Sequence, residues 1–475
     1  MRFRIASIFV AAALLLSCGV LAAGHLTLYA QREAVSLEET TLLGDVSAAE
    51  GVQVDIHTQL AAQLFWDTRY TAGTSPSIHT DYTHYWSEQD FFRNWQSDVL
   101  WADFTGSTGP TSWEWEEEDE SGMQKPYNDV ASRCPAGQDE YTERVYLRDY
   151  YEYFPIYVHG VDILPEDVTS IYLAGGESLE MMMQDFLRSQ FRFPVPEDLW
   201  VEITIGKAAD GSISLMGTGA YSDDYWMNPI VAAVRTEKGI YFTFSPGIMA
   251  DGRGPDFSHC TVGRGLYFLP VNLTPYEREN ISGVQEMTAV SLDTEHFRTV
   301  CPIAEDADGV SLYQSSDGQW IYLVSQQPAS CTLTVLRADT GAVTSQMTLF
   351  PREDPEMQYL GQVYCQEGYL IATRSDGAFA LVTVDEDGQA EMALTGDFAP
   401  VQAKECYLRD PVFDYDGERL AFADFATGYS TCSFFLGVMG PDGPEYLGKY
   451  YHNQEPEFCS PRDNAPLSVR LPDNT

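Results

Sequence analysis

The clearest pattern in the chain is a block of apolar residues at its N-terminus. After Arg2 and Arg4, an almost unbroken apolar run extends from Ile5 to Ala23. About 20 apolar residues can cross a bilayer as a helix, whereas the apolar core of a cleavable signal peptide usually has only ~7–15. The two cations ahead of the run favour a cytoplasmic N-terminus, so the rest of the chain is expected outside the membrane.

As an uncleaved anchor, this segment divides into three parts. Residues 1–4 form the cytoplasmic end, residues 5–26 the transmembrane helix and residues 27–50 a polar, acidic juxtamembrane stalk. We therefore expect a single-pass protein of the cell membrane with most of the chain extracytoplasmic, in contact with the membrane through its N-terminal helix.

Two alternatives for the segment stay open. Val20-Leu21-Ala22 is also compatible with a signal-peptidase site, and cleavage there would release the chain. Leu15-Leu16-Ser17-Cys18 is compatible with a bacterial lipobox, in which Cys18 would carry the lipid. The chain stays apolar beyond Cys18, which is unusual for a mature lipoprotein.

Beyond the stalk, the pattern is that of β-strands and tight turns. Residues 200–205 alternate between apolar and polar side chains, and a second strand starts at Ile213. Ala209-Asp210-Gly211 lies between them, which predicts a β-hairpin. Two further apolar stretches, residues 239–242 and 265–268, resemble each other but leave open whether they belong to one sheet or to two.

A repeat of four strands occupies the C-terminal third of the chain. Asp317-Gly318, Glu367-Gly368 and Asp416-Gly417 each lead into an apolar strand, at spacings of 50 and 49 residues. A short strand precedes each turn, a third strand follows, and a second Gly-containing turn and a fourth strand end each unit. Four strands at a fixed period predict propeller blades, most clearly at residues 309–350, 359–398 and 408–450.

The third unit resembles a known repeat. Pro411 to Gly440, with Asp-Tyr-Asp-Gly-Glu-Arg-Leu-Ala-Phe at residues 414–422 and a later Thr427-Gly428, resembles a TolB-type, WD-like propeller repeat. The layout as a whole resembles uncharacterised exported proteins of Gram-positive anaerobes. These resemblances imply an all-β ectodomain, residues 51–475, with a propeller-like fold of about six to eight blades. They imply no particular activity.

Composition narrows the range of partners. The formal net charge is −44, from 71 acidic and 27 basic residues, so the surface should repel nucleic acid and other polyanions. Hydrophobic residues make up 44% of the chain, which is enough for a full core and argues against disorder. The nine cysteines are far apart and form no CxxC motif, so we expect mainly buried free thiols.

Few residues form a pattern that indicates chemistry. His79, Asp81 and His84 lie close together in the sequence, but their spacing matches no common metal site. The carboxylates of the Asp-Gly turns lack the ligand spacing of an EF-hand loop. The chain has no GxSxG motif and no phosphate-binding Gly loop, and we expect no cofactor.

Aromatic residues provide the best candidate binding site. They gather in the N-terminal half, around Trp86 to Trp101 and around Tyr150 to Tyr157, where most are expected to fill the core. Trp113 and Trp115 differ because the acidic run at residues 116–120 follows them directly. That run must face water, so we interpret Trp113 and Trp115 as ligand-binding residues.

Together these patterns predict a membrane-anchored, extracytoplasmic binding or interaction module, with an envelope polysaccharide or a protein as partner. The alternatives are a propeller hydrolase acting on carbohydrate or peptide, and a structural envelope protein without a small ligand.

Replacing both Trp113 and Trp115 by Ala should weaken binding to cell-wall material while leaving the melting temperature almost unchanged, because exposed indoles contribute contacts to a ligand and little to the core. A pull-down with purified cell walls and a thermal melt check this. A large fall in melting temperature would show that the two indoles are core residues.

Overall fold

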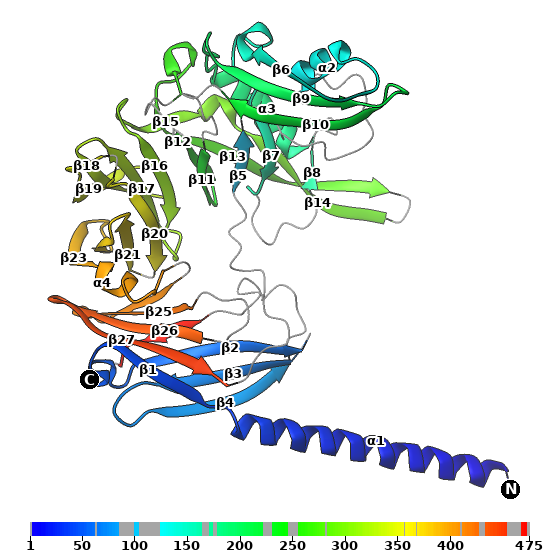
Figure 1. Cartoon of the computed structure of the whole chain (residues 1–475), viewed down its shortest axis with the longest axis vertical. Helices are drawn as coiled ribbons and strands as arrows, with labels where there is room; N and C mark the ends of the chain where they lie inside the picture. The colour runs from blue at the N-terminus through cyan, green and yellow to red at the C-terminus, as the bar shows by residue number, and fades with distance from the viewer. Residues whose placement is uncertain are drawn as a thin grey trace. The chain divides into compact units, whose positions relative to one another are not determined.

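The computed structural model describes residues 2–61, 64–84, 99–103, 124–163, 171–173, 178–221, 230–245, 255–280, 283–355, 357–366, 368–408, 411–426, 433–453 and 467–472. These residues divide into two compact units (Figure 1). Unit 1 comprises residues 1–95, 376–381 and 393–475, and unit 2 comprises residues 96–375 and 382–392. Each unit is described by itself.

The described chain is mostly β-structure. Its α-helices are α1 (Arg2–Glu33), α2 (Gln124–Arg133), α3 (Leu179–Gln190) and α4 (Ala399–Gln402). The strands of its first half are β1 (Leu37–Gly44), β2 (Gln53–Ala61), β3 (Leu64–Thr71), β4 (Ser77–His84), β5 (Leu100–Asp103), β6 (Gln138–Tyr146), β7 (Tyr157–Val161), β8 (Ile171–Tyr172), β9 (Trp200–Lys207), β10 (Ile213–Tyr221), β11 (Ile230–Thr236) and β12 (Gly239–Ser245).

The strands of the second half follow one another with short connections. They are β13 (Gly265–Asn280), β14 (Gly283–Leu292), β15 (Arg298–Pro302), β16 (Gly309–Gln314), β17 (Trp320–Gln327), β18 (Ser330–Arg337), β19 (Val343–Pro351), β20 (Leu360–Gln366), β21 (Tyr369–Arg374), β22 (Ala378–Val384), β23 (Ala390–Asp397), β24 (Val412–Tyr415), β25 (Leu420–Phe425), β26 (Ser433–Gly440), β27 (Gly443–His452) and β28 (Ser468–Arg470).

Each of the three predicted repeats forms an antiparallel meander. The strand orders are β16-β17-β18-β19, β20-β21-β22-β23 and β24-β25-β26-β27. This is the four-stranded unit of a propeller blade, so the prediction of an all-β, propeller-like fold after an N-terminal helix is confirmed. The other described sheets are less regular, with two to six strands, and the third repeat gains β1 as a fifth strand.

The repeated turns explain why these units fold locally. Their six glycines all have φ between 71° and 120°, a region that side chains with a Cβ rarely adopt: Gly318, Gly341, Gly368, Gly388, Gly417 and Gly443. The aspartates close the turns from within: Asp416 Oδ1 accepts the N–H groups of Glu418 at 2.9 Å and Arg419 at 2.7 Å. These carboxylates therefore serve the turns, as Asx caps do.

Unit 1 joins the two ends of the chain. Strand β1 pairs antiparallel with β27, and β2 pairs with β28. Part of the segment interpreted from the sequence as a stalk thus belongs to the folded unit, because its edge strand finds a partner near the C-terminus. The Glu39 carboxylate of β1 accepts a hydrogen bond from the buried Tyr446 hydroxyl at 2.9 Å. The Tyr446 hydroxyl oxygen also lies 2.6 Å from the Tyr450 hydroxyl oxygen.

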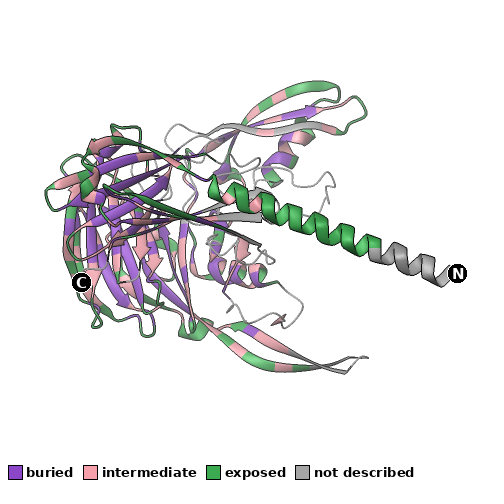
Figure 2. Ribbon diagram, turned by 90° about the horizontal axis from the view of Figure 1, so that it is seen from below, coloured by how far each residue is buried: buried purple, intermediate pink, exposed green. Residues whose placement is uncertain are grey.

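Helix α1 leads into this sheet through three residues. Its described residues are exposed over almost the whole length (Figure 2), and it is apolar and long enough to be a candidate membrane span or signal sequence. Asn453 brackets the connection to β1: its side chain donates to Ala34 O at 2.7 Å and accepts from Ser36 N at 3.0 Å. The helix therefore ends directly on the β1–β27 edge.

Unit 2 is built on a large aromatic and aliphatic core. Strands β6, β9 and β10 form one sheet, as the hairpin pattern predicts, and α2 and α3 contribute to the same core. Phe191 lies at its centre, with its ring in contact with those of Phe244, 4.7 Å away, and Tyr267, 5.1 Å away. Strand β12 pairs with β13, so the two similar stretches at residues 239–242 and 265–268 are neighbouring strands of one sheet.

Two turn glycines of nearly equal φ offer a matched stability test. A Cβ on Gly368 would meet no atom within 4 Å, whereas a Cβ on Gly388 would lie 2.4 Å from Trp320 Cζ3. Gly368→Ala should cost about 1–2 kcal/mol through backbone strain alone. Gly388→Ala should cost a further 1–3 kcal/mol or so, because the methyl group overpacks the indole. Urea unfolding of both variants measures the difference, and equal losses would contradict the packing argument.

Candidate functional site

The two tryptophans singled out in the sequence, Trp113 and Trp115, lie outside the described residues. Their assignment as ligand-binding residues therefore stays a prediction. Of the aromatic group that precedes them, Trp86, Phe91, Phe92 and Trp95 also lie outside the described residues. Trp101 is described, and it is exposed on β5.

The histidine-rich stretch forms strand β4. His79 is exposed and lies opposite Arg69 of β3, while Asp81 forms an ion pair with Arg32 at 3.7 Å. His84 is the last residue of β4, and its side chain is outside the described part. Within the described part of the chain, no group of three or more His, Cys, Asp or Glu residues is placed to hold a metal ion.

One cluster pairs two carboxylates with one arginine. Arg133 of α2 contacts Asp129 at 2.5 Å and Glu143 of β6 at 2.9 Å. Hydrogen bonds lower the pKa of both carboxyl groups. Asp129 accepts from the Tyr150 hydroxyl, which has the larger effect, and from Arg133, whereas Glu143 accepts mainly from Arg133. Both groups therefore stay ionised near neutral pH and have no proton to give as general acids. The structural role of the cluster is to connect α2 to the sheet.

The described cysteines are free thiols: Cys18, Cys134, Cys260, Cys301, Cys331, Cys365 and Cys406. Burial raises the pKa of Cys365 and of Cys406 to about 12, and that of Cys331 to about 11. These thiols are protonated at neutral pH, so they pack as small apolar side chains rather than act as nucleophiles.

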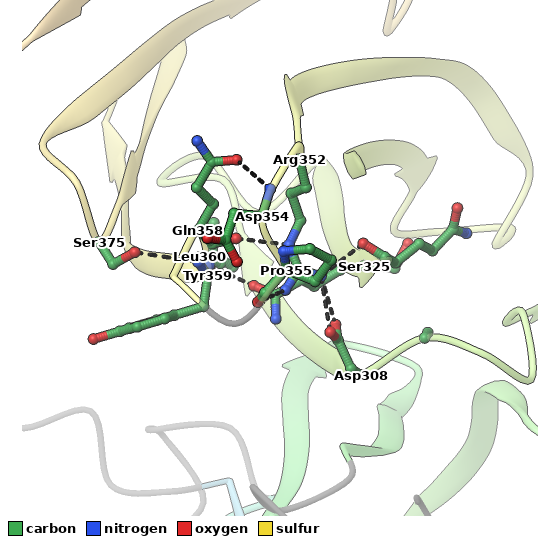
Figure 3. Close-up of polar contacts among 12 residues, drawn as sticks. Asp308, Ser325, Arg352, Asp354, Pro355, Gln358, Tyr359, Leu360 and Ser375 are labelled. Atoms are coloured by element: carbon green, nitrogen blue, oxygen red, sulfur yellow. Dashed lines mark hydrogen bonds and ion pairs between the residues drawn. The ribbon is translucent and has the colours of Figure 1, made fainter. Parts of the chain in front are cut away.

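The best-defined candidate site is the loop at residues 352–360, between β19 and β20, which the buried side chain of Arg352 anchors (Figure 3). This side chain is only 1% exposed, and its Nη1 lies 2.8 and 3.0 Å from the two carboxylate oxygens of Asp308. The guanidinium also donates to three main-chain carbonyls at 2.6 Å each: Gln327, Pro355 and Gln358. A charged group with this many partners fixes the path of the loop.

Two neutral side chains complete the anchoring. The side-chain oxygen of Gln358 accepts the N–H groups of Glu353 at 2.8 Å and Asp354 at 3.2 Å. The Ser375 hydroxyl accepts Tyr359 N–H at 3.2 Å and donates to Met357 O at 2.5 Å. Several main-chain polar groups of the described loop residues are thus bonded within the protein, as expected of partly buried backbone, while Met357 and Tyr359 keep exposed side chains.

The loop presents apolar side chains to solvent from this rigid frame. Met357 is 69% exposed and Tyr359 is 53% exposed. Figure 3 shows the Tyr359 ring directed away from the Arg352 contacts. Glu353 and Asp354 are exposed beside them, and the side chain of Arg374 donates to Pro351 O at 2.8 Å. An aromatic ring, a thioether and two carboxylates are groups that can contact a binding partner.

Sequence reasoning missed this loop. Arg352 gives only a faint signal, a charged residue that follows an apolar strand and lies between Pro351 and Pro355. Two of its partners, Asp308 just before β16 and Gln327 at the end of β17, are distant in the sequence, and no local pattern brings them to Arg352.

Comparisons with known proteins add little to the site. No family model matches the chain, and no curated protein is similar to it. A crystal structure of a Lactobacillus plantarum protein is 12% identical and has a TM-score of 0.23; the match covers 67% of this chain and all of that one. A Bacteroides uniformis protein assigned as a 6-phosphogluconolactonase is 10% identical with a TM-score of 0.22, over 66% of this chain and all of its own.

The dihydro-heme d1 dehydrogenase NirN, solved in complex with DHE, is 9% identical with a TM-score of 0.19, over 56% of this chain and 55% of its own. At such scores these similarities support no inference about activity.

Replacing Arg352 by Met should lower the free energy of unfolding by about 3 kcal/mol, because Asp308 and three carbonyls lose their donor inside the protein. The matched control is Arg144→Met, which removes an exposed arginine that pairs with Glu202 at 3.5 Å and stacks on the Trp200 ring at 3.6 Å. Because both contacts are at the surface, this change should cost only about 1 kcal/mol. Urea unfolding and limited proteolysis of the 352–360 loop measure the effect. Equal losses in the two variants would show that Arg352 does not anchor the loop.

Proposed function

We propose that the chain is a membrane-anchored, extracytoplasmic binding module that docks a protein segment on the loop at residues 352–360. Helix α1 serves as the uncleaved anchor in this proposal. In support, Asn453 hydrogen-bonds both sides of the short connection that joins α1 to β1, so the helix end is built into unit 1.

The observation that carries the binding role is the exposure of Met357 and Tyr359 on a loop that Arg352 holds rigid. Single exposed apolar side chains are ordinary on a protein surface, but two large ones two residues apart on an anchored loop form a patch whose burial by a partner would be favourable. Because the loop is already ordered, docking costs little conformational entropy, which is typical of residues that dominate binding energy.

Charge indicates the kind of partner. Glu353 and Asp354 are exposed beside the apolar pair, and the chain as a whole carries a formal charge of −44. A second copy of the same chain would be repelled at this surface, whereas a segment with Lys or Arg next to apolar residues would be attracted. We therefore assign the loop a cationic and apolar protein segment.

To test this, peptides that bind the full chain in lipid nanodiscs are selected from a phage-displayed random library. Enriched peptides should combine Lys or Arg with aromatic or aliphatic residues. The double variant Met357→Ala/Tyr359→Ala should weaken their binding by about tenfold or more, since it removes both anchors. The control Val343→Ala/Tyr407→Ala removes two exposed apolar side chains elsewhere and should leave the affinity unchanged.

Three results would count against the proposal: no enrichment, peptides without a basic residue, or equal binding by the double variant. Peptides recovered in cleaved form, detected by mass spectrometry, would instead support the hydrolase interpretation.

A further inference from the structure

A second surface of unit 2 exposes aromatic rings on ordered strands. Strands β5 and β7 pair antiparallel, and one face of this ribbon belongs to the core through Leu100, Ala102 and Val158. On the other face, Trp101 is 57% exposed. An indole left this open on a regular strand needs an explanation, because its burial would be favourable.

A β-bulge brings a second ring beside it. Trp101 pairs with Gly160, but the next residue, Ala102, pairs with Val158, so His159 is the extra residue of the ladder. Bulges turn a side chain away from the regular alternation, and here the imidazole lies next to the indole, with ring centroids 4.8 Å apart and planes at 43°. Gly160, opposite the indole, adds no bulk: a Cβ there would meet no atom within 4 Å.

Charged and polar groups flank the two rings along β7. Tyr157 lies two residues before His159, on the same side of the strand, and the Arg188 guanidinium lies 4.9 Å from its ring centroid. At the other end, the partly exposed carboxylate of Asp162 pairs with Arg235 at 3.0 Å. The surface is therefore two flat rings with hydrogen-bonding groups at both ends.

We propose that Trp101 and His159 form a carbohydrate-binding platform for a neutral polysaccharide. The apolar C–H face of a pyranose ring stacks on an indole, while its hydroxyl groups need donors and acceptors at the edge. Arg188 donates through Nε to Ile156 O at 2.8 Å, which leaves its Nη groups as donors. The carboxylate of Asp162 has lone pairs beyond its contact with Arg235. A polyanionic polymer would be repelled by the net charge of −44. The platform is independent of the 352–360 loop.

Its test measures binding of cello-, chito- and manno-oligosaccharides to the full chain in nanodiscs by calorimetry, with chitosan oligosaccharide as a cationic probe. At least one neutral probe should bind. Trp101→Ala should weaken it about fivefold or more, and Trp101→Phe should weaken it less, because it keeps part of the stacking surface. His159→Ala should weaken binding, and His159→Phe should restore it.

The control Tyr146→Ala removes an exposed aromatic side chain from β6 and should bind as the unaltered chain does. Thermal melts of all variants should coincide, since Trp101 is exposed. The proposal is overturned if no neutral probe binds, if Trp101→Ala binds equally well, or if only chitosan binds and salt abolishes its binding, which would indicate a cation site.

Discussion

The pairing of β1 with β27 is the constraint on which unit 1 depends. It closes a sheet whose other strands come from the C-terminal repeat, and the Glu39–Tyr446 hydrogen bond fixes its register. Three residues separate helix α1 from this ladder, so helix and sheet are one continuous piece. If α1 spans a membrane, the β1–β27 edge is held at the surface of that membrane, with little freedom to swing away from it.

How much of the fold and of the candidate site the sequence predicts depends on how far apart the interacting residues are along the chain. The Asp-Gly turns are local, so Gly318 and Gly417 predict their hairpins from composition alone. Strand β1 is not predictable in this way, because its partner lies at the far end of the chain and its polar composition resembles a stalk. The roles of Arg352 and His159 are missed because they also depend on residues distant in the sequence. Arg352 anchors its loop through Asp308 and Gln327, and His159 lies beside Trp101 because of a β-bulge that residue composition does not reveal.

Two of the few basic residues are used inside the fold. Arg352 and Arg264 turn their guanidinium groups toward main-chain carbonyls; Arg264 donates to Glu305 O and Ala307 O at 2.8 Å each. Arg133 holds two carboxylates. With 27 basic residues against 71 acidic ones, cations used inside the fold leave a surface field that is predominantly negative. Such a field attracts cationic molecules and repels anionic ones before any contact forms.

The long separation between β1 and β27 also sets the order in which the chain can fold. Glu39 and Tyr446 are 407 residues apart. At about 5–20 residues per second, synthesis delivers β27 roughly 20–80 s after β1. During that time β1 is an unpaired edge, open to wrong partners, while the main segment of unit 2 emerges complete and can build its core. Unit 1 is therefore the last part to mature, and loss of the C-terminal strands during synthesis would leave β1 without a partner, although β2, β3 and β4 could still pair with one another.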